Sequence, residues 1–195
     1  MLRHTTSLFR PLSAALAAVS LTLVAAAPSL AKEYADEGTA ALLKVLGDSK
    51  VSLADGIQQV AKGGEAAISA KLELDDDNKL SLSVYTAEKG LGEDAEHNVL
   101  KEFSGGPTQP PWSPEVEVFK DIPHVSRASE QLALMALANQ PLANFVVTAQ
   151  KQHKGMVFSA SPEVYKHRPV VLVLVADQGK VNEYRYDLAT GHSIR

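Results

Sequence analysis

The sequence predicts an α+β fold in which helices pack on one face of an antiparallel β-sheet. Two segments carry apolar residues at helical spacing, and each precedes segments in which apolar and polar residues alternate. At the end of the chain, within 169–195, a run of β-branched residues and leucine is joined to an alternating run by a tight turn. A two-stranded ribbon of this kind is not stable alone in water, so the preceding segments must cover its apolar face.

Residues 1–31 are predicted to be a signal peptide. A basic start precedes a run rich in Ala, Leu and Val, and the small residues Ser29 and Ala31 suit a peptidase that cuts after Ala31. A competing cut after Ala27 is disfavoured because a proline would follow it. An uncleaved membrane anchor is also disfavoured, because the apolar run is short for a span. The sequence thus predicts a periplasmic or secreted protein that is not an integral membrane protein after cleavage.

The composition argues against several kinds of partner. The chain has 19 basic and 23 acidic residues and no cysteine. Residues 1–31 hold two arginines and no acidic residue. The remaining chain has 17 basic and 23 acidic residues, which is a net charge of −6 with histidine neutral. An acidic chain is a poor binder of nucleic acid or of an anionic membrane surface. The lack of cysteine excludes a disulfide framework.

An N-terminal helical segment is predicted over 32–50. Within it, residues 37–46 have apolar side chains at helical spacing, and Gly47 can end the helix. A second helix is predicted over 53–62, because Ser52 is a suitable N-cap and apolar side chains recur at i, i+4, i+7 and i+8.

Two strands are predicted to follow the second helix. Residues 66–74 and 80–85 alternate between apolar and polar side chains, and the acidic run 75–78 forms the turn between them. Helix, strand, turn and strand make one unit. A candidate strand over 115–119 completes its sheet after a loop over 104–114, in which four prolines exclude regular structure.

The second half of the chain is predicted to repeat this unit. Val125 and Ser126 match Val51 and Ser52 at the start of a helix. The predicted elements of the second copy are a helix over 127–139 capped by Ser126 and strands over 145–149, 156–159, 170–176 and 181–188.

The closing run EYRYDLATGH, residues 183–192, resembles the end of the PepSY domain family, in which the last strand leads into an Asp-x-x-Thr-Gly turn. The helices with serine caps and the antiparallel strands after them resemble the same family. The resemblance covers 51–87 and 125–195. It implies a first PepSY-like unit over 51–120, which lacks the Asp-x-x-Thr-Gly ending, and a second over 121–195.

The resemblance also implies a function. PepSY domains occur in the propeptides of thermolysin-type secreted proteases and in many exported proteins. We therefore expect a non-enzymatic binding module with a protein partner in the cell envelope, either a protease that it restrains or another envelope protein. One alternative is a small-ligand or peptide binder that uses a groove between the two units. Another is a hydrolase whose site is assembled only in space.

Local motifs for catalysis, for a cofactor or for a metal are missing from the sequence. The histidines are scattered, and the run 75–78 lacks the glycine and the distal glutamate of an EF-hand. There is no Gly-x-Ser-x-Gly elbow and no glycine-rich phosphate loop. Glu115 and Glu117 lie two apart on one strand face, where a solvent-facing role is favoured over an acid–base pair. We expect no catalytic residue, cofactor or metal.

Two features are candidates for partner binding. Trp112 lies among prolines, where it is either packed into the core or presented to a partner, and packing is favoured. The closing strand combines aromatic and charged groups in Tyr184, Arg185, Tyr186 and Asp187. Tyrosine and arginine are frequent at interfaces, although the solvent-facing side of a sheet has a similar composition.

Overall fold

The computed structural model describes residues 37–194, and the predicted signal peptide with its cleavage site lies outside them. The described chain confirms the α+β class. Its elements are α1 (Glu37–Val45), the 3₁₀ helix η2 (Leu46–Asp48), α2 (Leu53–Lys62), β1 (Ala66–Leu74), β2 (Leu80–Ala87), β3 (Leu100–Gly105), β4 (Glu115–Val118), α3 (Ile122–Met135), α4 (Leu142–Gln152), β5 (Met156–Tyr165), β6 (Arg168–Asp177), β7 (Lys180–Asp187) and β8 (Ser193–Ile194).

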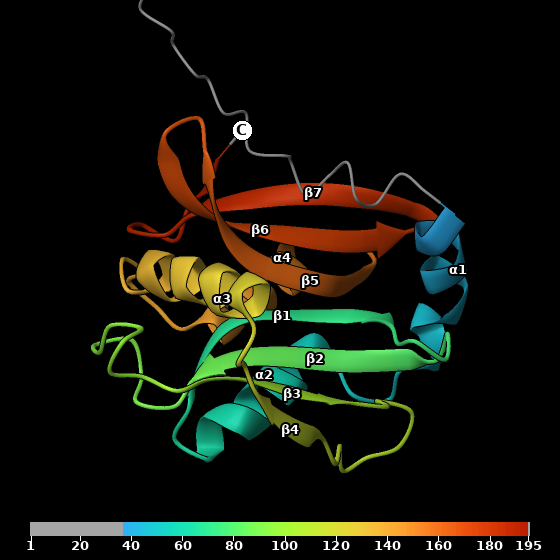
Figure 1. Cartoon of the computed structure of the whole chain (residues 1–195). Coiled ribbons are helices and arrows are strands. Elements are labelled where there is room, and N and C mark those ends of the chain that lie inside the picture. Colours follow the sequence, from blue (N-terminus) through green and yellow to red (C-terminus); the bar gives the residue numbers. More distant parts are fainter. Residues whose placement is uncertain (1–36, 195) are drawn as a thin grey trace, which may run out of the picture.

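The described strands form one antiparallel sheet in the order β4-β3-β2-β1-β5-β6-β7-β8 (Figure 1). Each half of the chain contributes four consecutive strands, and the halves meet where β1 pairs with β5. In that pairing Ala70 stands opposite Ala160, and Lys71 stands opposite Ser159. Both strands carry a bulge just before their serine, at Ala67/Ser69 and at Val157/Ser159.

Helices lie on both faces of this sheet. Figure 1 shows α2 and α4 behind the strands and α3 in front of them, across β1 and β5. On the α2 side, Gly56 lets the helix approach the sheet, because a Cβ there would lie 2.5 Å from Leu82 Cδ2. On the α4 side, Phe145 contacts Tyr186 edge to face, with 6.4 Å between ring centroids. The sequence predicts helices on one face only, and this is wrong, because α3 lies on the face opposite to α2 and α4.

The helices and turns of the first half follow the prediction closely. The Ser52 hydroxyl caps α2 by accepting from the Asp55 N–H at 3.1 Å. Gly63 ends the helix, and Gly64, with φ of 94°, starts the turn into β1. The acidic run 75–78 forms a turn held by the Asp75 carboxylate, which accepts from two backbone N–H groups.

The second half differs from the prediction at its helices. Residues 145–149 are not a strand but the middle of α4, where Phe145, Val146 and Ala149 are buried at helical spacing. A short apolar run fits a strand and a buried helix equally well, which explains the error. The preceding helix begins at Ile122 rather than at 127. It is capped by Asp121 and started by a proline, so Ser126 lies within it.

Two strands and one extension were not predicted. β3 includes the first two residues of the predicted loop 104–114, and the two-residue β8 pairs with β7. β5 continues six residues beyond its predicted end, through Pro162, to Tyr165. Charged residues in β3 and the proline in β5 obscure the alternation on which strand prediction depends. None of the helices in the described part of the chain is long and apolar enough to span a membrane.

Candidate functional site

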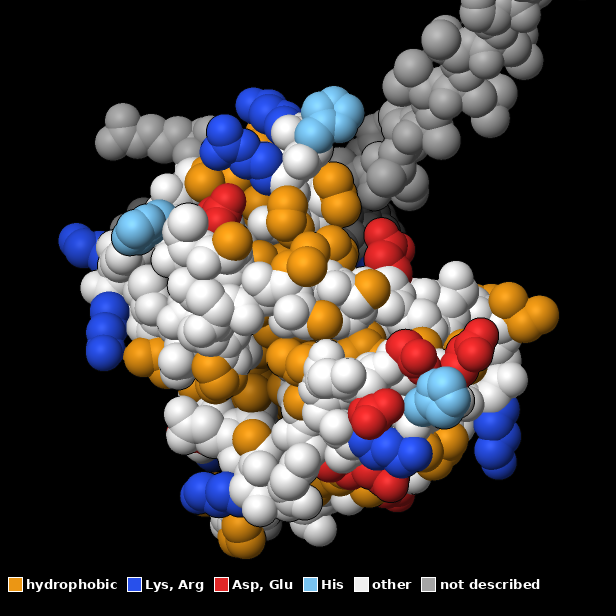
Figure 2. Space-filling view, turned by 90° about the vertical axis from the view of Figure 1, so that its left-hand side faces the viewer, with side chains coloured by type: hydrophobic (Ala, Val, Ile, Leu, Met, Phe, Trp, Pro, Cys, Tyr) orange, Lys and Arg blue, Asp and Glu red, His pale blue; other side chains and the backbone are white. Residues whose placement is uncertain are grey.

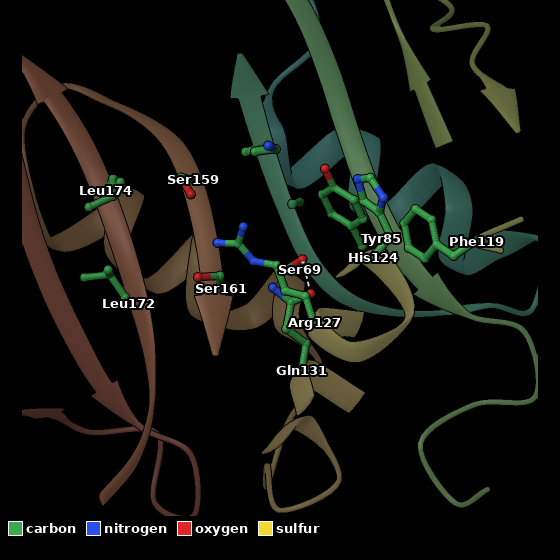
Figure 3. A pocket seen from close by; sticks show the side chains of 12 residues that line it. Ser69, Tyr85, Phe119, His124, Arg127, Gln131, Ser159, Ser161, Leu172 and Leu174 are labelled. Carbon is green, nitrogen blue, oxygen red and sulfur yellow. Dashed lines mark hydrogen bonds between the residues drawn. The ribbon is translucent and has the colours of Figure 1, made fainter. Parts of the chain in front are cut away.

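A cavity of about 140 Å³ lies on the α3 side of the sheet, at the boundary between the two halves (Figure 3). β1 and β2 line it from the first half, and β5 and β6 line it from the second. Helix α3 and Phe119, just before it, form the remaining wall. Leu172 and Leu174 of β6 provide an apolar floor. Because both halves supply walls, the cavity exists only in the assembled sheet.

A buried hydrogen bond fixes α3 over the central strands. The Ser69 hydroxyl donates to Gln131 Oε1 at 2.8 Å, and both side chains are almost fully buried. Buried polar groups are costly unless they are paired, so this bond favours one position of the helix. The position of α3 in turn sets where its other cavity-lining residues point.

Aromatic rings form one wall of the cavity. The ring of Phe119 stacks on Tyr85 with 5.7 Å between centroids and on His124 with 5.3 Å. The His124 Nδ1 is held by the Asp121 carboxylate at 2.7 Å. Hydrogen bonds from the His124 backbone N–H and ring hold the pKa of Asp121 below its ordinary value. This wall presents flat apolar surface with a polar edge.

Lys71 is a cation that the protein itself neutralises. Its Nζ lies 2.5 Å from Glu73 Oε2 and 5.7 Å from the centroid of the Tyr85 ring. Burial alone would lower the pKa of Lys71, but its interactions with Tyr85 and Glu73 outweigh burial and raise the pKa above the ordinary lysine value. Burial also raises the pKa of Tyr85 to about 12, so its hydroxyl is neutral at pH 7.

Arg127, an exposed residue of α3, is the second cation in the cavity lining. Its side chain reaches from α3 toward β5, where the hydroxyl groups of Ser159 and Ser161 lie (Figure 3). Among the described residues, no carboxylate forms an ion pair with Arg127. A guanidinium beside two hydroxyl groups is a set of donors suited to a carboxylate or another planar anion.

A second hollow, of about 460 Å³, is mostly apolar. It lies between α2 and the start of α4, and it includes Leu91 and the turn 138–141. Figure 2 views this end of the molecule, where hydrophobic side chains gather in the middle and charged side chains surround them. It has fewer polar groups than the first cavity, so it offers less to fix a ligand's orientation.

The predicted partner-binding residues do not form one surface. Trp112 is 3% exposed and its indole N–H donates to the Gly105 carbonyl at 3.1 Å, which confirms the favoured interpretation that it packs into the core. Tyr184 stacks on His153 with 3.3 Å between centroids, and Tyr186 is fully buried against α4. These two tyrosines face the α4 side of the sheet.

The charged members of that set serve local structure. Arg185, on the α3 side of the sheet, pairs with Glu163 at 2.8 Å and with Glu183 at 2.9 Å. The Asp187 carboxylate accepts from the Thr190 N–H at 2.9 Å and closes the terminal Asp-x-x-Thr-Gly turn. Sequence reasoning missed Lys71 and Arg127. They lie 56 positions apart in the chain, and no local motif marks either one.

Between residues 37 and 194, no three acidic or histidine side chains converge as a metal site would require. No protein-family model matches the sequence, and no curated protein matches it. The crystal structure of a candidate lipoprotein from Clostridium difficile 630 is similar at a TM-score of 0.37 and 14% identity, with 75% of this chain and 92% of that chain covered. At this level the similarity carries no conclusion about fold or function.

Proposed function

We propose that this protein is an exported, non-enzymatic binding protein that holds a small organic carboxylate in the cavity between its two halves. The expectation of export rests on the predicted signal peptide over 1–31. A ligand groove between the two units is one of the alternatives expected from the sequence. The position of the cavity at the β1–β5 boundary supports it.

One observation carries the proposal: Arg127 projects into the cavity, and no carboxylate in the described part of the chain forms an ion pair with it. An arginine fork binds a carboxylate through two parallel hydrogen bonds, which combines charge with geometric selectivity. The hydroxyl groups of Ser159 and Ser161 supply further donors on the opposite wall. Lys71 adds little net charge, because Glu73 neutralises it.

The size and the apolar walls restrict the body of the ligand. A cavity of about 140 Å³ matches the space that one benzene ring fills in an engineered protein cavity of about 150 Å³. The rings of Tyr85, Phe119 and His124 offer a flat surface, and the leucine floor offers an apolar one. We therefore infer a carboxylate attached to one ring or to a short aliphatic chain. The C-terminal carboxylate of a peptide has the same chemistry.

The two PepSY-like units also remain a proposal, which the order of elements supports. α2 and α4 each precede four antiparallel strands. Their buried positions have the same spacing, Leu53, Ala54, Gly56, Ile57 and Val60 in α2 and Leu142, Ala143, Phe145, Val146 and Ala149 in α4. When α2 and α4 are aligned in this way, α4 is the counterpart of α2 in the second unit. α3 is then an insertion that covers the β1–β5 boundary and supplies Arg127.

The direct test is a titration of the full chain with benzoate by isothermal calorimetry, with benzamide as the neutral control. We expect benzoate to bind and benzamide to bind at least about tenfold more weakly, because the arginine fork loses its anionic partner. Arg127→Gln should weaken benzoate binding by about tenfold. Arg168→Gln, on an exposed arginine at the start of β6, is the matched control and should leave binding unchanged.

Peptides with a free or amidated C-terminus distinguish the two sources of a carboxylate. Tighter binding of the free-acid peptide than of benzoate would favour a peptide ligand. If neither benzoate nor the free-acid peptide binds, the proposed function is wrong. It is also wrong if Arg127→Gln binds benzoate as tightly as the parent chain. A protein partner, including a protease, remains a second proposal. The surface that supports it is the free edge of β4.

A further inference from the structure

We propose that the free edge of β4 binds an extended polypeptide segment in which basic and apolar side chains alternate, so that the segment becomes a further strand of the sheet. β4 ends the strand order, three strands away from β1, although Phe119, directly after β4, lines the cavity. The inference concerns a protein partner bound by the backbone of β4, and none of the residues of β4 lines the carboxylate cavity.

The backbone of β4 has unused hydrogen-bonding groups. No described strand lies beyond β4, which ends the strand order on that side. The Phe119 N–H donates to the Leu100 carbonyl at 3.0 Å, so position 119 bonds toward β3. Because this direction alternates along an antiparallel strand, the backbone of Glu115 and Glu117 also bonds toward β3. The N–H and C=O groups of Val116 and Val118 therefore point outward, where an added strand can bind them.

The side chains of β4 present two different surfaces to an added strand. All four residues are exposed, and Val116 and Val118 are 54% and 41% exposed on one face of the sheet. Soluble proteins protect such an edge with short strands, charged side chains, proline or a bulge. β4 is four residues long and carries two glutamates, but it has no proline and no bulge within its span, so a segment with basic side chains can still pair with it. Apolar side chains of an added strand would cover both valines.

The other face of β4 carries carboxylates that form no ion pair in the described chain. Glu117 stands directly opposite Glu102 of β3, and Glu115 lies on the same face opposite Ser104. Like charges in opposed positions destabilise a sheet. None of these three carboxylates forms an ion pair with a described residue. Lysine or arginine side chains of an added strand would lie beside both glutamates of β4 and offset the repulsion.

The charge pattern also disfavours a second copy of this chain as the occupant. Two antiparallel copies of β4 would bring Glu115 and Glu117 of one copy next to the same residues of the other. An added strand with alternating basic and apolar residues matches both faces at once. Recognition by strand addition takes affinity from the backbone and specificity from the alternate side chains.

The test is an NMR titration of the full chain with two synthetic peptides, one that alternates lysine and valine and one that alternates glutamate and valine. We expect the Lys/Val peptide to bind, to slow amide hydrogen exchange at Val116 and Val118, and to bind more weakly as salt is added. The Glu/Val peptide should not bind.

Two variants make the result specific to this edge. Val116→Pro removes an outward N–H without removing a bond to β3, and it should weaken binding of the Lys/Val peptide by about tenfold. Combined Glu115→Lys and Glu117→Lys substitutions keep the backbone edge, so they should reverse the preference toward the Glu/Val peptide. If Val116→Pro does not fold, the chain with Glu115→Lys and Glu117→Lys still tests the inference.

Several outcomes would overturn this inference. Equal binding of both peptides would show that charge does not select the strand. Binding unchanged in Val116→Pro, or shifts confined to the cavity around Arg127, would place the peptide elsewhere. Self-association of the peptide-free chain through β4 would make a second copy the occupant. Loss of benzoate binding in Arg127→Gln has no bearing on these results, so the two proposals fail independently.

Discussion

The hydrogen bond between Ser69 and Gln131 allows a quantitative test of how α3 is held on the sheet. We consider Ser69→Ala, Gln131→Met and the double variant. Ser69→Ala leaves the buried Gln131 amide oxygen without its donor, and both residues are less than a tenth exposed. An unsatisfied buried polar group costs ~1–3 kcal/mol, so we expect the free energy of unfolding to fall by about 2 kcal/mol.

The double variant removes both polar partners and should not carry that cost twice. We expect its loss to be smaller than the sum of the two single losses by about 1 kcal/mol, within the ~0.5–3 kcal/mol typical of contacting residues. Urea unfolding followed by the fluorescence of buried Trp112 measures all four chains. Additivity within about 0.4 kcal/mol would refute the hydrogen bond as the contact that fixes α3.

Three further predictions concern the packing of the helices and the pH dependence of stability. Phe145→Ala removes a fully buried ring that contacts Tyr186, and it should cost ~3–5 kcal/mol in urea unfolding, whereas a cost under about 1 kcal/mol would argue against this packing. Gly56→Val should also destabilise, by ~1–3 kcal/mol or more, because the added carbons would meet Leu82, and an unchanged unfolding midpoint would contradict that close approach. Burial lowers the pKa of His153 below its ordinary value of 6.5, so the unfolded chain takes up the proton first and stability should fall as pH drops below about 6.5. His153→Gln should remove part of that slope between about pH 5 and 7, and an unaltered slope would assign it to other groups.

Much of the fold follows from local patterns in the sequence. The cap at Ser52, the alternation in β1 and β2 and the β-branched run of β6 each have one physical interpretation, and the structure has these elements. The run from Phe145 to Ala149 has two physical interpretations, because a short apolar stretch suits a buried helix as well as a strand. The prediction therefore assigned these residues to a strand, took 127–139 as the helix of the second unit and missed α4.

The candidate site could not be predicted in the same way. Its cation, Arg127, is distinguished by its place in the cavity wall and by the lack of an ion pair with any described carboxylate, and both are properties of the folded chain. The cavity also depends on α3 crossing to the opposite face of the sheet, a position set by the long-range contact of Gln131 with Ser69. Trp112 is different, since its surrounding prolines already favoured a packed role and its burial confirms that interpretation.

The carboxylate proposal is tested most directly at the guanidinium itself. The measurement is an NMR titration that follows the Arg127 Nε–H resonance and the Ser159 and Ser161 amides as benzoate is added. The account predicts saturable shifts at all three positions, with none at the control Arg168 and none with benzamide. Shifts absent from Arg127, or equally large with benzamide, would contradict a carboxylate site between the two halves.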